Sequence, residues 1–189
     1  MMAPDMDKSP ELIELIDHYE KWRRIYSYAG EAPPDEPDWE DNRLYFRIGY
    51  PYPDWSALVL EMAPDGLYRV LQVSTERRNE PVESLRGVFS RIEDAGKFII
   101  YKVATSLMIG CNMDPLSWRW DDEGINPEVD IHIQSDAITK YVLREKPEAY
   151  FIMTRGDMPY SHLLPLSYDR LDAELLASFP DSVTSRVNP

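Results

Sequence analysis

The sequence predicts an α+β fold, with an antiparallel sheet of about six strands and three main helices packed on it. Two observations lead to this prediction. Segments with strand-like alternation are joined by connections that are too short for a parallel crossover. Helical patterns stand before, between and after the groups of strands. We interpret residues 1–189 as a single domain, because a chain of this length buries a core without disulfides.

The first helix is expected over residues 10–28. Ser9 suits the N-cap, Pro10 the first helical position, and Glu11 the positive end of the helix dipole. Gly30 is expected to end the helix. Apolar residues recur at spacings of three and four, at Leu12, Leu15, Ile16, Tyr19, Trp22 and Tyr26.

Residues 31–41 are expected to form an acidic, proline-rich, flexible loop. This segment, EAPPDEPDWED, holds six acids, three prolines and no base. Such a composition favours solvation over packing.

Strands are expected over residues 43–50, 56–63, 67–75 and 83–90. In the first strand, Leu44, Phe46 and Ile48 belong to the core side, whereas Tyr45 and Arg47 belong to the opposite side. The sequence Pro64-Asp65-Gly66 is typical of a turn, so the second and third strands form a hairpin.

A second helix is expected from about residue 91 to 109, with Ser90 and Glu93 as a capping box and Gly110 as the stop. Residues 111–127 have no clear period and are interpreted as irregular. Strands in hairpins are expected at 129–134, 138–145 and 148–154, and Ser167 caps a last helix that continues to about residue 178.

The sequence contains no strong catalytic motif. Cys111 is the only cysteine, so there is no disulfide framework, and a reducing, cytoplasmic location is the simple interpretation. Cys111 with His132 or His162 as base is a possible nucleophile pair, but Cys111 ends an apolar helix, where its pKa is not lowered. An ordinary half-buried thiol, a solvent-facing His132 and a loop-packing His162 are the plainer interpretations.

Cofactors and metals are not expected. The segment Asp121-Asp122-Glu123-Gly124 lacks the ligand order of a calcium loop, and the glycines are scattered instead of forming a phosphate loop. The chain carries many carboxylates, but the sequence does not show whether two of them face each other across a cleft.

The net charge of −14 limits the classes of partner. A field of this sign repels nucleic acid and anionic lipid and attracts basic proteins, although plain solubility is an equally simple use of it. The N-terminal stretch lacks the features of a signal peptide, and no run of apolar residues is long enough to span a membrane.

Two segments combine aromatic residues with acids, a composition found at protein interfaces. The first, DWEDNRLYFRIGYPYPDW, contains Trp39, Tyr52 and Trp55 as candidate contacts in loops around a core strand. The second, residues 118–123, contributes the candidates Trp118, Trp120, Asp121, Asp122 and Glu123. Such rings also cover the ends of sheets, so an interface and a simple cover for the sheet both remain open interpretations.

Part of the chain resembles a known family. The stretches are FSRIEDAGKF (89–98), VDIHIQ (129–134), ITKYVLRE (138–145) and SHLLPLSYDRLDAELLASFPDSV (161–183). From about residue 80 onward, the chain resembles mycobacterial and actinobacterial immunity proteins that neutralise NAD-glycohydrolase toxins of the tuberculosis-necrotizing-toxin type. The resemblance lies in the order and texture of segments and includes no residue-level contact motif.

The resemblance implies a cytosolic antidote that binds its toxin one to one, covers the NAD site, and needs no cofactor or catalysis. The acidic field suits a toxin with a basic active-site cleft, whose natural ligand is an anionic dinucleotide. Two alternatives remain: an enzyme acting on a sugar or cationic small substrate through paired carboxylates in an acidic aromatic cleft, and a scaffold subunit that forms a stable homodimer.

Overall fold

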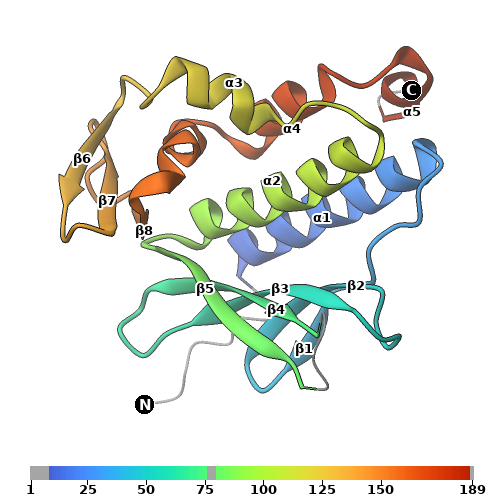
Figure 1. Cartoon of the computed structure of the whole chain (residues 1–189), viewed down its shortest axis with the longest axis horizontal. Coiled ribbons are helices and arrows are strands. Elements are labelled where there is room, and N and C mark those ends of the chain that lie inside the picture. Colours follow the sequence, from blue (N-terminus) through green and yellow to red (C-terminus); the bar gives the residue numbers. More distant parts are fainter. Residues whose placement is uncertain (1–8, 76–79, 188–189) are drawn as a thin grey trace.

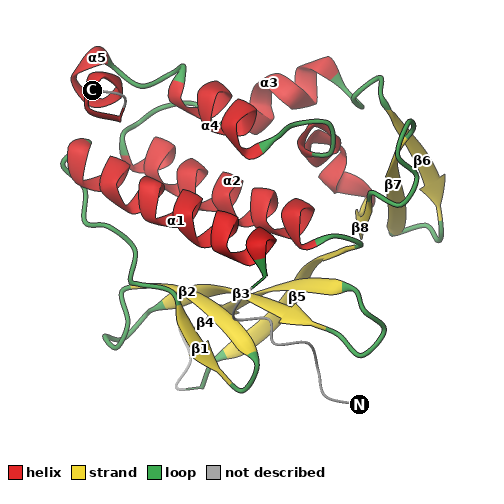
Figure 2. Ribbon diagram, turned by 180° about the vertical axis from the view of Figure 1, so that it is seen from behind, coloured by secondary structure: helices red, strands yellow, loops and turns green. Residues whose placement is uncertain are grey.

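The computed structural model describes residues 9–75 and 80–187 and has an α+β fold (Figure 1, Figure 2). Within these residues, eight strands form one antiparallel sheet in the order β1-β2-β3-β4-β5-β8-β7-β6. The predicted class and antiparallel character are confirmed, and the sheet is larger than the six strands expected. The first eight residues lie outside the described part of the chain.

The strands are β1 (Asp38–Glu40), β2 (Arg43–Ile48), β3 (Ser56–Met62), β4 (Tyr68–Ser74), β5 (Val82–Phe89), β6 (Val129–Ile133), β7 (Ile138–Leu143) and β8 (Tyr150–Thr154). The helices are α1 (Pro10–Tyr28), α2 (Ile92–Gly110), α3 (Leu116–Glu123), the 3-10 helix η2 (Arg155–Leu163), α4 (Tyr168–Leu176) and α5 (Asp181–Val187). No helix among the described residues is both long enough and apolar enough to cross a membrane.

Helices α1 and α2 lie side by side and cover one face of β2–β5 (Figure 1, Figure 2). Ser9 caps α1 as expected, because its hydroxyl accepts a hydrogen bond from the Leu12 amide at 3.2 Å. The apolar stripe of α1 is buried, and the Tyr26 hydroxyl donates to the Val103 carbonyl at 2.9 Å, which joins the two helices. Leu44 and Phe46 are in the core as expected, whereas Ile48 is exposed.

Strand β5 connects two parts of the sheet that pack against different helices. It pairs with all of β4 but shares only two residue pairs with β8, Val88 with Ile152 and Phe89 with Phe151. Figure 1 shows β6, β7 and β8 standing away from β1–β5, beside α3 and η2. Strand β6 is therefore the last strand at one edge of the sheet, and β1 is the last at the other.

Buried ion pairs fix the later helices to the first two. The Asp172 carboxylate on α4 accepts hydrogen bonds from Lys21 Nζ and Trp22 Nε1, both at 2.7 Å, and lies 2.8 Å from His18 Nδ1. On α2, the buried Lys97 pairs with Asp94 at 2.9 Å and donates to the Leu166 carbonyl at 2.7 Å. Every buried charge named here is paired, so both clusters have a structural role.

Several expected boundaries are wrong. Residues 38–40 of the expected loop form β1, residues 116–123 of the expected irregular segment form α3, and α5 follows the helix that was expected to be last. The capping box at Ser90 does not form: Arg91 is the N-cap, and the Ser90 hydroxyl instead bonds the main chain of Tyr150 at 3.0 and 2.8 Å. A tertiary contact has therefore taken the side chain that the local pattern assigned to the helix.

Candidate partner-binding surface

The Arg47 corner is the surface formed by the segment 31–41, the end of β2 and the loop 49–55. Arg47 is its centre and is only 5% exposed. Its guanidinium lies 4.3 Å from the centre of the Tyr45 ring, 4.7 Å from that of Tyr50 and 5.8 Å from that of Trp55. A desolvated cation over aromatic faces is a favourable contact, so Arg47 holds these three rings in place.

Two acids of β1 complete the cluster. Arg47 Nη1 lies 3.0 Å from Asp38 Oδ2, and Nη2 lies 2.8 Å from Glu40 Oε1. Both carboxylates keep a large part of their surface in solvent, whereas the guanidinium does not. The positive charge is therefore hidden while acids and ring edges face outward, which leaves the corner with an acidic surface.

Besides the pairing of β1 with β2, hydrogen bonds at Pro34 and Asp35 hold the proline-rich segment to the rest of the protein. Tyr19 Oη donates to the Asp35 carbonyl and Arg23 Nε to the Pro34 carbonyl, both at 2.9 Å. The Asp35 amide donates to the Arg47 carbonyl at 2.9 Å, and the Asp35 carboxylate accepts from the Tyr50 amide at 3.1 Å. The segment expected to be a free loop is thus pinned to α1, β2 and the loop 49–55, and such preorganisation lowers the entropy cost of binding.

The three predicted residues of this region differ in exposure. Tyr52 is 73% exposed in the loop 49–55, so most of its side chain is available to a partner. Trp55 is half-buried and packs on a small apolar cluster of Ala57, Val59 and Val73, on the sheet face away from α1 and α2. Trp39 is half-buried against the main core. Tyr52 is therefore the main candidate, and Trp39 and Trp55 mainly support the surface.

Helix α3 carries the second predicted group and divides it. Trp118 is 62% exposed, and Asp121, Asp122 and Glu123 are also exposed. Trp120 is 1% exposed and lies between Tyr101 and His162, with ring centres 5.4 and 5.5 Å away. Trp120, a predicted partner contact, is therefore buried in this structure, where its ring anchors α3 to the core.

The two groups of candidate residues lie on separate parts of the surface. In both Figure 1 and Figure 2, α3 lies on the far side of the α1–α2 pair from β1 and β2. A single small partner that contacts the Arg47 corner therefore does not contact α3 at the same time. The structure offers two separate acidic, aromatic surfaces.

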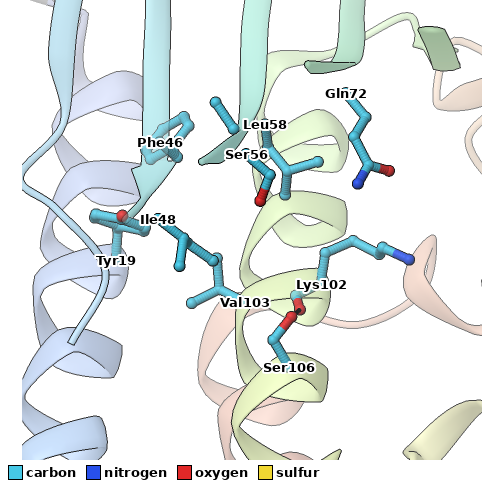
Figure 3. A pocket seen from close by; sticks show the side chains of 10 residues that line it. Tyr19, Phe46, Ile48, Ser56, Leu58, Gln72, Lys102, Val103 and Ser106 are labelled. Atoms are coloured by element: carbon cyan, nitrogen blue, oxygen red, sulfur yellow. Dashed lines mark hydrogen bonds between the residues drawn. The ribbon is translucent and has the colours of Figure 1, made fainter. Parts of the chain in front are cut away.

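A small cavity of about 160 Å³ lies beside the Arg47 corner, under the β2–β3 hairpin (Figure 3). Ile48 and Ser56, which pair at the base of the loop 49–55, line it together with Tyr19 and residues of α2. Lys102 also lines it, and burial with the nearby Arg86 lowers the pKa of its amine. No carboxylate lines this cavity, so the paired acids of a glycosidase-like site are not found there.

A second cavity of about 390 Å³ includes Cys111 and lies between the ends of α1 and α2 and the start of α5. Burial and the nearby Glu31 raise the pKa of the Cys111 thiol, which disfavours the thiolate. Neither His132 nor His162 lines this cavity. His132 is exposed on β6, and His162 is buried with Nε2 2.8 Å from the Gly124 carbonyl oxygen, so the considered cysteine–histidine pair does not form.

Metal-binding groups are also absent from the part of the chain that the structure describes. No three His, Cys, Asp or Glu side chains within residues 9–75 and 80–187 are grouped to hold an ion. Asp121, Asp122 and Glu123 are consecutive on a helix, so their carboxylates diverge around the axis instead of converging.

The Arg47 cluster is the feature that the sequence pattern missed. Alternation places Tyr45 and Arg47 on the same face of β2, which is a correct signal. The pattern does not show that β1 and the loop 49–55 fold over that face and supply Asp38, Glu40 and Tyr50.

Comparison with known proteins shows the fold alone. No protein-family model matches the chain, and no curated protein sequence matches it. The fold is similar to the solved structure of Rv3902c from M. tuberculosis, with a TM-score of 0.60, 13% sequence identity and 94% of each chain covered. The likeness extends over nearly the whole length of both chains, so the two proteins share a fold.

Proposed function

We propose that this chain is a cytoplasmic immunity protein that binds a cognate NAD-glycohydrolase toxin one to one and blocks its active site. The observation that carries the proposal is the Arg47 corner, a preorganised acidic surface with the exposed side chain of Tyr52. The resemblance of residues from about 80 onward to immunity proteins of such toxins supports the same conclusion. The binding would need no cofactor and no catalysis by this chain.

The chemistry of the corner suits a basic cleft. A cleft that binds the anionic NAD dinucleotide must present positive charge, and the exposed Glu36, Asp41 and Asp54 of the corner complement that charge. An exposed tyrosine on a pinned loop is a suitable anchor, since tyrosine is enriched among interface residues that contribute most of the binding energy. Acids speed the encounter, and the anchor slows release.

The enzyme alternative receives no support from the two cavities described above. Neither is lined by an aspartate or glutamate, and the acids of the corner lie on an open surface. We therefore favour binding over catalysis.

A titration tests the proposal. A purified toxin domain of the tuberculosis-necrotizing-toxin type is incubated with increasing amounts of this protein, and NAD hydrolysis is followed. We expect activity to fall linearly and to end at one equivalent, with a one-to-one complex in light scattering. A heat-denatured sample serves as the control. Unchanged hydrolysis with the cognate toxin, and no complex on a sizing column, would reject the proposal.

A further inference from the structure

The outer edge of β6 is an open strand edge. Strand β6 is the last strand of the sheet, and no described residue pairs with its outer side. Its sequence, VDIHI, contains no proline or lysine to protect such an edge, and its one charged residue, Asp130, is paired with Arg144 at 3.0 Å. Ile131 is 43% exposed and Ile133 is 60% exposed, so an apolar pair flanks the unpaired main chain.

The hydrogen-bond pattern shows which main-chain groups are free. The Arg144 amide donates to the Glu128 carbonyl at 2.8 Å, and the Gln134 amide donates to the Ile138 carbonyl at 2.9 Å. Bonded and non-bonded pairs alternate in an antiparallel ladder, so even-numbered residues of β6 bond to β7. The amide and carbonyl groups of Ile131 and Ile133 therefore point outward, away from β7.

We propose that this edge pairs with the same edge of a second copy, which joins two eight-stranded sheets across a twofold axis. A twofold contact must be self-complementary, and β6 meets this condition in one antiparallel register. Ile131 then lies opposite Ile133 of the second copy, and each of these residues uses both of its free main-chain groups. Edge-to-edge strand addition is a common mode of association between proteins.

Two other symmetric registers are available in principle, with Ile131 opposite Ile131 or Ile133 opposite Ile133 of the second copy. Hydrogen bonds of the neighbouring residues exclude both. A shift that places Ile131 opposite its own copy would need Val129, whose amide already donates to the Asn126 carbonyl at 3.0 Å. The opposite shift would need Ser135, whose amide already donates to the Ile138 carbonyl at 3.2 Å. Only the register between them satisfies the free groups without breaking a bond that exists in the monomer.

The side chains also favour a second copy. Ile131 and Ile133 lie on the sheet face shared with the buried Tyr141 and Thr139, so four isoleucines would continue the apolar surface across the seam. On the other face, Asp130 lies opposite Gln134 of the second copy, and His132 lies opposite its own copy. Asp130 is already paired with Arg144 at 3.0 Å, so no unpaired acids face each other.

The charges around the seam are of both signs. Residues 128–148, which surround it, contain five acids and three bases, and Asp130 is paired with Arg144. The Arg47 corner lies in the other part of the sheet, near β1, so both corners stay open in the dimer (Figure 1). The inference does not depend on the proposed function.

Cross-linking tests the register. In a Cys111→Ser background, His132→Cys is expected to form an intermolecular disulfide under mild oxidation, because directly opposed residues on the axis have Cβ atoms about 5 Å apart. Asp130→Cys is the matched control. In the proposed register residue 130 lies opposite residue 134 of the second copy, so the two introduced cysteines are four residues apart along the strand and should not form a disulfide. Equal cross-linking of both variants, or none of His132→Cys, overturns the proposal.

Sedimentation equilibrium from micromolar to millimolar protein tests the association itself, and we expect a reversible dimer. Ile133→Lys should weaken the dimer by about tenfold or more, because edge lysine blocks strand addition. Ile109→Lys is the control, since Ile109 is 58% exposed but lies at the end of α2. Ile131→Pro, which removes an outward amide that β7 does not use, should act like Ile133→Lys.

Circular dichroism and thermal unfolding confirm that each variant is folded. A wild-type protein that stays monomeric at millimolar concentration overturns the proposal, and so does a dimer that Ile133→Lys leaves intact. A loss of association in Ile109→Lys equal to that in Ile133→Lys would place the contact elsewhere and overturn it as well. None of these outcomes depends on a toxin, so they are separate from the test of inhibition.

Discussion

The Arg47 corner and helix α3 have similar compositions and different structures. Each combines tryptophan, arginine and acids within a short segment. In the corner the arginine is buried and holds the rings, and the acids face outward. In α3 a tryptophan is buried, and Arg119 is exposed, where it forms ion pairs with Glu123 and Glu174.

The difference shows that composition alone does not separate an exposed acidic, aromatic surface from an anchored helix. What separates them is the residue that provides the anchor. A buried cation organises several rings at the surface, since rings contact it from several sides. A buried indole uses its own ring as the anchor, so only its neighbours on the other side of the helix remain available.

The largest expected effect separates the two tryptophans of α3. Trp120→Ala should lower the free energy of unfolding by about 3–5 kcal/mol, because it leaves a cavity between Tyr101 and His162. Trp118→Ala should change it by less than about 0.5 kcal/mol, because this side chain is exposed. Urea unfolding at neutral pH measures both. Similar costs for the two substitutions would contradict the assignment of Trp120 as the anchor.

A smaller effect separates the two arginines. Arg47→Ala should destabilise the protein by about 2 kcal/mol, since three rings lose their cation and its packed stem. Arg119→Ala should cost less than about 1 kcal/mol, because its ion pairs are exposed. The same unfolding experiment compares them, and tryptophan fluorescence reports whether Trp55 changes environment only in Arg47→Ala. If Arg47→Ala cost no more than Arg119→Ala, the corner would not be organised by its arginine.

A kinetic effect separates the two sets of acids and depends on the proposed function. The triple variant Glu36→Gln, Asp41→Asn, Asp54→Asn should slow toxin association by roughly tenfold at low salt. Asparagine suits positions 41 and 54, where φ is 50° and 67°. The matched variant Asp121→Asn, Asp122→Asn, Glu123→Gln removes the same charge from α3 and should slow association by less than about threefold. Stopped-flow mixing at two salt concentrations distinguishes them, and equal slowing would leave the two surfaces equivalent.

Much of the fold follows from periodicity in the sequence. Helix α1 has the predicted bounds because its apolar residues recur over five turns and its cap is local. Helix α3 was missed because only Leu116 and Trp120 are buried in its eight residues, too few to show a period. Strand β1 is three residues long and acidic, so it forms only because β2 offers an edge with Arg47.

The candidate site was less predictable than the fold. Composition predicts Tyr52 as a candidate contact, and Tyr52 is strongly exposed in the corner. Arg47 was placed on the correct face of its strand, but its role depends on Asp38, Glu40, Tyr50 and Trp55, which converge only in the tertiary structure. The burial of Trp120 likewise depends on Tyr101 in α2 and on His162 near the end of η2.

Hydrogen exchange of the toxin complex tests most directly whether the Arg47 corner is the docking surface. Amide exchange is compared between the free protein and the protein with one equivalent of toxin. The account predicts slower exchange within residues 31–41 and 47–55, and unchanged exchange within 116–123. Protection of 116–123 with none in the corner would contradict it and would assign docking to α3.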